Sequence, residues 1–314
     1  LYRVYFDAQQ YDKSWCVAST LSFFGKADAE QKKFYEQYKP TGVQMTNRLD
    51  NQRWVKDLFH PDESIFIGKM LEPLSYGALR AKASSDKALH LLKKYEVDLS
   101  TSTATFARTY NFVSQVLSLP LVPRLYLRPD AAGGLMHVAG SDPPAVVCGN
   151  ALLSGYTQAH LGFVIGKHLA YYRGEHFIRT LITSHTELKG LLVAGLQLSG
   201  VVPPSAELAA TVQALQSQLG PTQIDALRSI SKKFIEAEPN ADIKRWIQSV
   251  ELTACRTGFL FCNDLTAAAQ LLQSLPPEGP VDLPVREKIK ELALFSVSEE
   301  YFRLREHLGL RIRV

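Results

Sequence analysis

The chain has 314 residues, of which 46% are hydrophobic and 21% are charged, and its formal net charge is +4 at pH 7. These values are typical of a soluble globular protein with about two domains. The basic residues are scattered, so we expect no nucleic-acid-binding surface. No run of about 18 apolar residues occurs, so we expect no membrane span.

Four cysteines are present, and none belongs to a C-x-x-C pair. So few cysteines do not provide a disulfide framework for a chain of this length, which favours a reducing compartment and a cytoplasmic location. No signal peptide is recognisable. Because the chain begins at Leu1 rather than at a methionine, a longer protein with an upstream targeting signal stays an open alternative.

The first sixty residues contain two predicted helices. Apolar residues at helical spacing predict helices over residues 2–24 and 28–38, joined at Gly25. Asp28 is a candidate N-cap, with a glutamine three residues later as in a capping box. The segment 8–14 resembles the turn of a tetratricopeptide (TPR) hairpin. That motif is strong only when it repeats, and a simple αα-hairpin explains the single copy equally well.

Residues 40–117 combine an irregular stretch with three further predicted helices. A short helix is expected over Leu49–Phe59, and a longer one over residues 64–80, with Pro73 kinking its end. The third covers Thr103–Leu117. Its predicted buried stripe is formed by Phe106, Tyr110, Val113 and Leu117.

The character of the sequence changes at Pro120. Short apolar runs at 125–127 and 145–148, bounded by prolines and glycines, predict strands, and 135–138 is a candidate third strand. The rest of the chain is predicted to be helical. The expected helices cover residues 156–172, 176–198, 205–218, 222–236, 240–260, 264–274 and 284–308, the last as one helix or a pair, with a loop over 276–280. The pattern predicts an α+β fold that is mostly α with one small sheet.

Several segments after residue 103 follow one another in a recognisable order. They are a helix followed by LPLVPRLYL (119–127), the run VVCGNALL (146–153), LGFVIG (161–166), ELTACRTG (251–258), and a closing helix with Pro284, Arg286 and Ile289. In this order they resemble the catalytic core of HtpX-like and CAAX-protease-like zinc metallopeptidases. The resemblance covers roughly residues 103–310 and implies a gluzincin-like helical core. It also suggests a C-terminal module that follows TPR-like helices in bacterial repeat proteins.

The residues that carry the family's chemistry are replaced in this chain. Zinc metallopeptidases of this type use an HExxH helix, in which two histidines four residues apart bind zinc on one face and the glutamate handles the proton of the zinc-bound water. By the resemblance, Lys167 and Tyr171 stand at the two histidine positions and His168 at the glutamate position. Glu251 corresponds to the third zinc ligand, and Cys255 stands where the family has aspartate. A protonated lysine does not bind zinc.

Glu251 lies beside a predicted apolar stripe, and a buried carboxylate without zinc needs another cation. We expect Lys167 to pair with Glu251, whereas the alternative is that Lys167 extends to solvent. His160, His168 and His176 are spaced by eight residues and therefore do not converge on a helix, so structural roles are expected. A last set of residues, the small Gly162, Gly166 and Gly258, predicts close packing of the helix at 160–173 on the helix at 243–260.

These observations predict a TPR-like helical segment over residues 1–60 and a catalytically inactive metallopeptidase-like domain over residues 61–314. The expected role is a protein-interaction or scaffolding module, with no catalytic residue, no metal and no cofactor. Its former substrate cleft could bind an extended peptide by strand pairing. The alternative is a metal-dependent hydrolase with a rearranged, non-HExxH site, although no H-x-x-x-H pair occurs in the chain.

Overall fold

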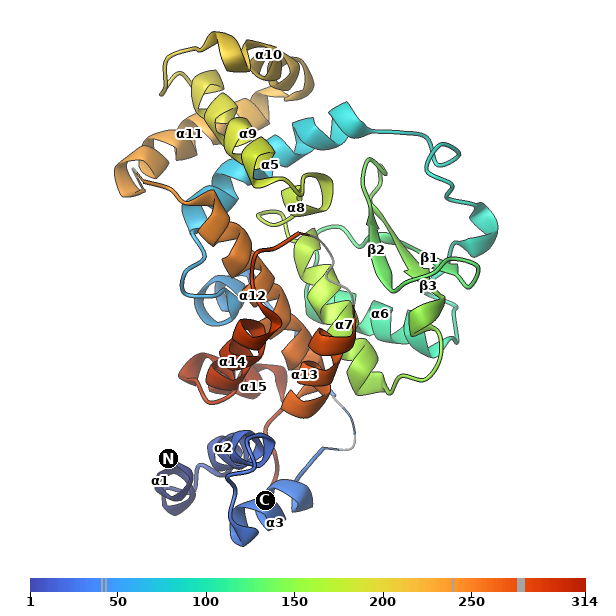
Figure 1. Cartoon of the computed structure of the whole chain (residues 1–314), viewed down its shortest axis with the longest axis vertical. Coiled ribbons are helices and arrows are strands. Elements are labelled where there is room, and N and C mark those ends of the chain that lie inside the picture. Colours follow the sequence, from blue (N-terminus) through green and yellow to red (C-terminus); the bar gives the residue numbers. More distant parts are fainter. Residues whose placement is uncertain (41, 43, 239, 276–279) are drawn as a thin grey trace.

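The structure is a computed structural model, and it describes every residue except 41, 43, 239 and 276–279. Helices α7 (Gln158–Leu169) and α12 (Ile243–Cys262) pack side by side near the centre of the molecule, with a three-stranded sheet next to α7 (Figure 1). The predicted α+β fold, mostly α with one small sheet, is confirmed. Among the described residues, no helix combines the length and apolar composition that crossing a bilayer requires.

The N-terminal part begins with three helices rather than two, namely α1 (Tyr2–Asp7), α2 (Tyr11–Phe23) and α3 (Ala29–Gln37). The prediction of one continuous helix over 2–24 is wrong, because the chain reverses at Gln9, which has a φ of +57°. Apolar spacing does not reveal a short turn when the helices on both sides keep the same period. The predicted N-cap of α3 is confirmed, since Asp28 and Gln31 form a capping box.

Several helical elements connect α3 to the central helices. Helix α4 (Asn51–Arg53) continues into a π-helical turn (Trp54–Leu58). Helix α5 (Ile65–Lys82) closely matches the helix predicted over 64–80, and Pro73 lies in its interior and not at its end. Proline removes the donor to the carbonyl of Lys69, but this residue is exposed and water can replace that donor. After a 3₁₀ turn (Lys93–Tyr95), helix α6 (Thr105–Val116) buries the predicted stripe.

The sheet contains all three predicted strands, β1 (Arg124–Arg128), β2 (Leu135–Val138) and β3 (Ala145–Gly149). Their order is β1-β3-β2, with β1 parallel and β2 antiparallel to the central β3. The outer edge of β1 is partly covered by a bridge between Glu96 and Tyr126. Strand β2 forms the other edge of the sheet and contacts α7.

The stretch predicted as one helix over 176–198 consists of α8 (Ile178–Leu181) and α9 (His185–Leu198), so this prediction is wrong. The helix ends because the Arg179 guanidinium donates to the carbonyls of Ile182 and Thr183, and Ser184 then caps α9. The next elements are a 3₁₀ turn (Ala206–Leu208), α10 (Ala209–Gln218), α11 (Pro221–Ala237), α13 (Leu265–Ser274), α14 (Val285–Phe295) and α15 (Glu299–Leu308). Residues 276–279 of the predicted loop lie outside the described residues.

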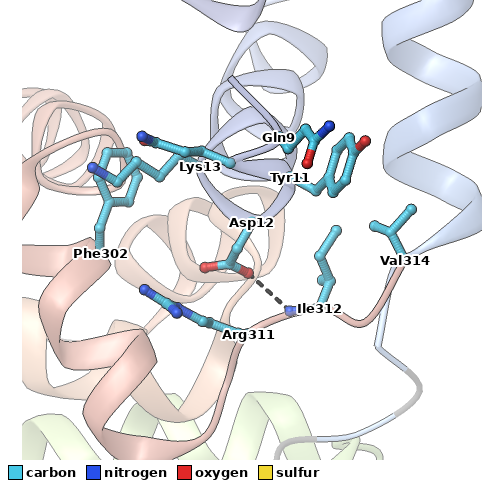
Figure 2. A pocket seen from close by; sticks show the side chains of 9 residues that line it. Gln9, Tyr11, Asp12, Lys13, Phe302, Arg311, Ile312 and Val314 are labelled. Atoms are coloured by element: carbon cyan, nitrogen blue, oxygen red, sulfur yellow. Dashed lines mark hydrogen bonds between the residues drawn. The ribbon is translucent and has the colours of Figure 1, made fainter. Parts of the chain in front are cut away.

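The C-terminal residues return to the N-terminal helices. The fully buried Arg305 of α15 donates to both carboxylate oxygens of Asp12 at 2.8 and 2.7 Å and to the Asn263 side chain at 2.6 Å. Figure 2 shows the cavity beside this contact, where the Ile312 backbone N–H donates to Asp12 at 2.9 Å. The charged side chains that line it are already paired: Asp12 with Arg305, Lys13 with Glu299, and Arg311 with Glu306.

Candidate functional site

The close contact of α7 and α12 builds the candidate site. A Cβ atom on Gly162 would lie 2.6 Å from the Phe261 carbonyl oxygen, and a Cβ on Gly258 would lie 2.5 Å from the Phe163 carbonyl oxygen. Both distances are too short for any side chain, so the predicted glycine contact is confirmed. Thr157 caps the N-terminus of α7, and Asp242 caps that of α12. Their approach brings the C-terminal end of α7 opposite the middle of α12.

Glu251 of α12 lies in this contact, and its carboxylate binds the side chains of two lysines and one tyrosine. The Lys167 Nζ lies 3.3 Å and the Tyr171 hydroxyl 2.5 Å from Oε2, and the Lys288 Nζ from α14 lies 2.5 Å from Oε1. The Cys255 Sγ, one helical turn further, is 3.9 Å from Oε1. The predicted ion pair between Lys167 and Glu251 is therefore confirmed, and the alternative of an extended, solvated Lys167 is wrong.

Glu251 and the three side chains that bind it most closely are buried. Glu251 is 3% exposed, Lys167 and Tyr171 are each 7% exposed, and Lys288 is 6% exposed. Burial acts to raise the pKa of Glu251, but the charges of Lys167 and Lys288 outweigh it and lower the pKa below its ordinary value. The carboxylate is therefore ionised, and it is the counter-ion of the two ammonium groups.

This donor set does not fit zinc. Both oxygens of Glu251 accept hydrogen bonds from buried donors, and an ammonium group offers a positive charge rather than a lone pair. Zinc requires about four nitrogen, sulfur or oxygen ligands in tetrahedral order. Throughout the part of the chain that the structure describes, no group of three or more histidine, cysteine, aspartate or glutamate residues is arranged to hold a metal ion.

His168 is part of a different cluster. Its fully buried ring stacks on that of His137 from β2, with the ring centroids 3.9 Å apart and the planes 16° apart. The Nδ1 of His137 lies 3.1 Å from the Tyr172 hydroxyl, which donates to the carbonyl of Ala145 on β3. These rings join the end of α7 to the sheet. Sequence reasoning missed His137, which reaches this cluster because β2 packs on α7. It also missed Tyr172, which follows His168 by four residues in the turn that continues α7.

The other histidines on this stretch have separate roles. His160 completes the capping box of α7 with Thr157. His176 is fully buried, with its Nε2 2.6 Å from Glu63 and its Nδ1 3.0 Å from the carbonyl of Ala170. Burial acts to lower the pKa of His176, but the Glu63 carboxylate and these hydrogen bonds raise it. As predicted, the three histidines do not converge.

Lys288 is the residue of the Glu251 cluster that sequence reasoning missed, although the sequence does contain a signal for it. Lys288, Leu292 and Phe295 follow one another at helical spacing along α14, and all three are buried. A lysine in line with an apolar stripe predicts a buried cation that needs a counter-ion.

No protein-family model matches this chain, and neither a curated protein nor a solved structure matches it. The resemblance to zinc metallopeptidases thus rests on the order of the sequence motifs.

Proposed function

We propose that this chain is a catalytically inactive metallopeptidase-like module over residues 61–314, preceded by a TPR-like helical segment over residues 1–60, and that it serves protein interaction or scaffolding. One observation carries this proposal. The Glu251 carboxylate, the remaining candidate metal ligand, is neutralised by Lys167 and Lys288 and accepts a hydrogen bond from Tyr171.

Two physical consequences of this arrangement support the loss of catalysis. The buried ammonium groups repel a divalent cation and take the place that a metal would fill. Because both oxygens of Glu251 accept hydrogen bonds from buried donors, this carboxylate is not free to act as a general base toward a water molecule.

The sheet supports a role in binding. Strand β2 is an edge strand, and an edge presents backbone donors and acceptors to an extended peptide. Its Met136 side chain is 38% exposed and provides an apolar contact beside that edge. The edge lies next to the His137–His168 stack, at the end of α7 where the family's substrate cleft would lie.

Elemental analysis of the purified and dialysed protein tests the loss of the metal. We expect wild type and Glu251→Gln to contain equal zinc, far below one ion per chain. About one zinc per wild-type chain that is lost in Glu251→Gln would overturn the proposal in favour of a metal-dependent hydrolase with a rearranged site. Zinc present equally in both proteins would place the metal elsewhere and would also contradict a metal-free module.

A further inference from the structure

A second cavity, of about 580 Å³, lies where the start of α5 meets the junction of α11 and α12. We call it the acidic cavity, because its lining includes four carboxylates and a single guanidinium: Asp62, Glu63, Glu238, Asp242 and Arg245. This is a local concentration of negative charge on a chain whose formal net charge is +4.

Two of these carboxylates already have a cationic or imidazole partner. Asp62 pairs with Arg245 at 2.8 Å, and the buried Glu63 contacts His176 at 2.6 Å. The other two accept hydrogen bonds from neutral groups. Glu238 accepts from the Ser64 hydroxyl at 2.6 Å, and Asp242 accepts from the backbone N–H of Arg245 at 3.0 Å. Within the described residues, neither Glu238 nor Asp242 forms an ion pair, so both charges are available to a ligand.

An independent observation comes from Trp246, which also lines the acidic cavity. This side chain is 1% exposed, and its indole Nε1 has no hydrogen-bond partner among the described residues. The other two tryptophans differ in this respect, because the indoles of Trp15 and Trp54 donate to the carbonyls of Tyr35 and Leu117 at 3.1 Å. A buried N–H without an acceptor is unfavourable, and a ligand carbonyl would satisfy it.

The apolar part of the lining fits the same kind of ligand. Ile65, Phe66 and Ile67 at the start of α5 line the acidic cavity beside the carboxylates. A lysine or arginine side chain has an aliphatic stem that packs on such residues while its charged end reaches a carboxylate.

We propose that the acidic cavity binds a peptide segment that carries lysine or arginine side chains. Glu238 and Asp242 would take the positive charge, the apolar wall would cover the stem, and Trp246 would donate to a backbone carbonyl. The proposal rests on the function of this chain as a protein-interaction module, but it does not depend on the absence of zinc. The zinc content of the same preparation therefore tests the two proposals separately.

Nuclear magnetic resonance of the three indole N–H groups provides a direct test, with the Trp246 signal assigned from its loss in Trp246→Phe. The probe is a short blocked peptide of alternating lysine and alanine, and the matched control peptide alternates glutamate and alanine. We expect the lysine peptide to shift the Trp246 signal and to leave the signals of Trp15 and Trp54 in place. An unmoved Trp246 signal, or an equal response to the glutamate peptide, would overturn the proposal.

Charge-neutral variants test the two carboxylates. Glu238→Gln with Asp242→Asn removes both charges but keeps the acceptor for Ser64 and the N-cap of α12. We expect its Kd for the lysine peptide to rise about tenfold. The control, Glu207→Gln with Asp225→Asn, removes two exposed charges outside the acidic cavity and should leave the Kd unchanged.

Because the formal net charge of the chain is +4, equal weakening by both double variants would show nonspecific attraction to surface carboxylates and would contradict a site. Spermidine, a polycation without a carbonyl, should not shift the Trp246 signal as the peptide does. If spermidine gives the same shift, the acidic cavity selects charge alone and the assignment to a peptide is wrong.

Discussion

Glu251 has two buried ammonium partners, so losing the carboxylate and losing one lysine are different changes. Without the carboxylate, both Lys167 and Lys288 lose this counter-ion in a site where water has almost no access. Without Lys167, the carboxylate keeps Lys288 and the hydrogen bond from Tyr171. The shared carboxylate thus makes the three charges one coupled unit.

We expect Glu251→Gln to lower the free energy of unfolding by about 3–5 kcal/mol, because it strands buried charge. Lys167→Met should cost less, and the double variant should recover part of the loss. Urea unfolding of the two single variants and the double variant measures this coupling. Additive effects would show that the two residues do not interact. Lys290→Met on α14, whose side chain is 66% exposed, is the control and should stay within about 0.5 kcal/mol of wild type.

At the scale of elements, the contact of α7 with α12 depends on glycines at the crossing. A side chain at Gly258 would meet a carbonyl oxygen of the other helix, and backbone does not move aside as a flexible side chain does. The position of Lys167 and Tyr171 relative to Glu251 therefore depends on residues that carry no functional group.

We expect Gly258→Ala to force the two helices apart and to lower the free energy of unfolding by about 1–3 kcal/mol. A matched helical glycine is Gly190 of α9, where a Cβ atom would meet only the Leu208 Cδ2 at 3.8 Å. Gly190→Ala should be neutral or should stabilise by up to about 1 kcal/mol through its higher helix propensity. Thermal unfolding of both variants compares them, and an equal, small effect at Gly258 would contradict the close crossing.

Sequence reasoning succeeded where one local signal decides the structure. Prolines and glycines on either side of the apolar runs indicated where the three strands begin and end. The Asp28 capping box indicated the start of α3. The continuous helix predicted over 2–24 is interrupted at Gln9, within the segment 8–14 that resembles a hairpin turn, and the end of α8 was missed. The helix period continues across the first, and the second depends on the Arg179 side chain binding nearby carbonyls.

The candidate site was predictable in part for the same reason. Glu251 and Lys167 could be paired from their places in ordered motifs. The apolar stripe that contains Lys288 signals a buried cation but does not identify its counter-ion. Lys288 comes from α14, 37 residues after Glu251, and this contact is set by tertiary packing. His137 reaches His168 because β2 lies at the edge beside α7.

At the scale of the whole molecule, a buried ion pair connects α2 to α15. Asp12 on α2 and Arg305 on α15 bond through both carboxylate oxygens, and the Arg305 guanidinium also lies 5.0 Å from the centre of the Trp15 ring. The N-terminal helices are thus part of the same packed body as α15, whatever their evolutionary relation to TPR hairpins.

We expect Asp12→Asn to lower the free energy of unfolding by about 3–5 kcal/mol, because it leaves the Arg305 guanidinium buried without its counter-ion. Limited proteolysis should show faster cleavage within α1–α3 at the same time. The control is Arg311→Gln, which removes an exposed pair with Glu306 next to the same cavity and should change stability by less than about 0.5 kcal/mol. Unchanged cleavage in Asp12→Asn would argue against a fastening role.

Asp12 and Arg305 are separated by 293 residues of sequence, and this separation affects the order in which parts of the chain fold during synthesis. A ribosome adds about 5–20 residues per second, so the first helices exist for roughly 15–60 s before their arginine is made. During this interval the Asp12 carboxylate and the aromatic side chains around it lack the helix that later encloses them. The segment around Asp12 therefore reaches its final packing only after Arg305 has been synthesised, 293 residues later.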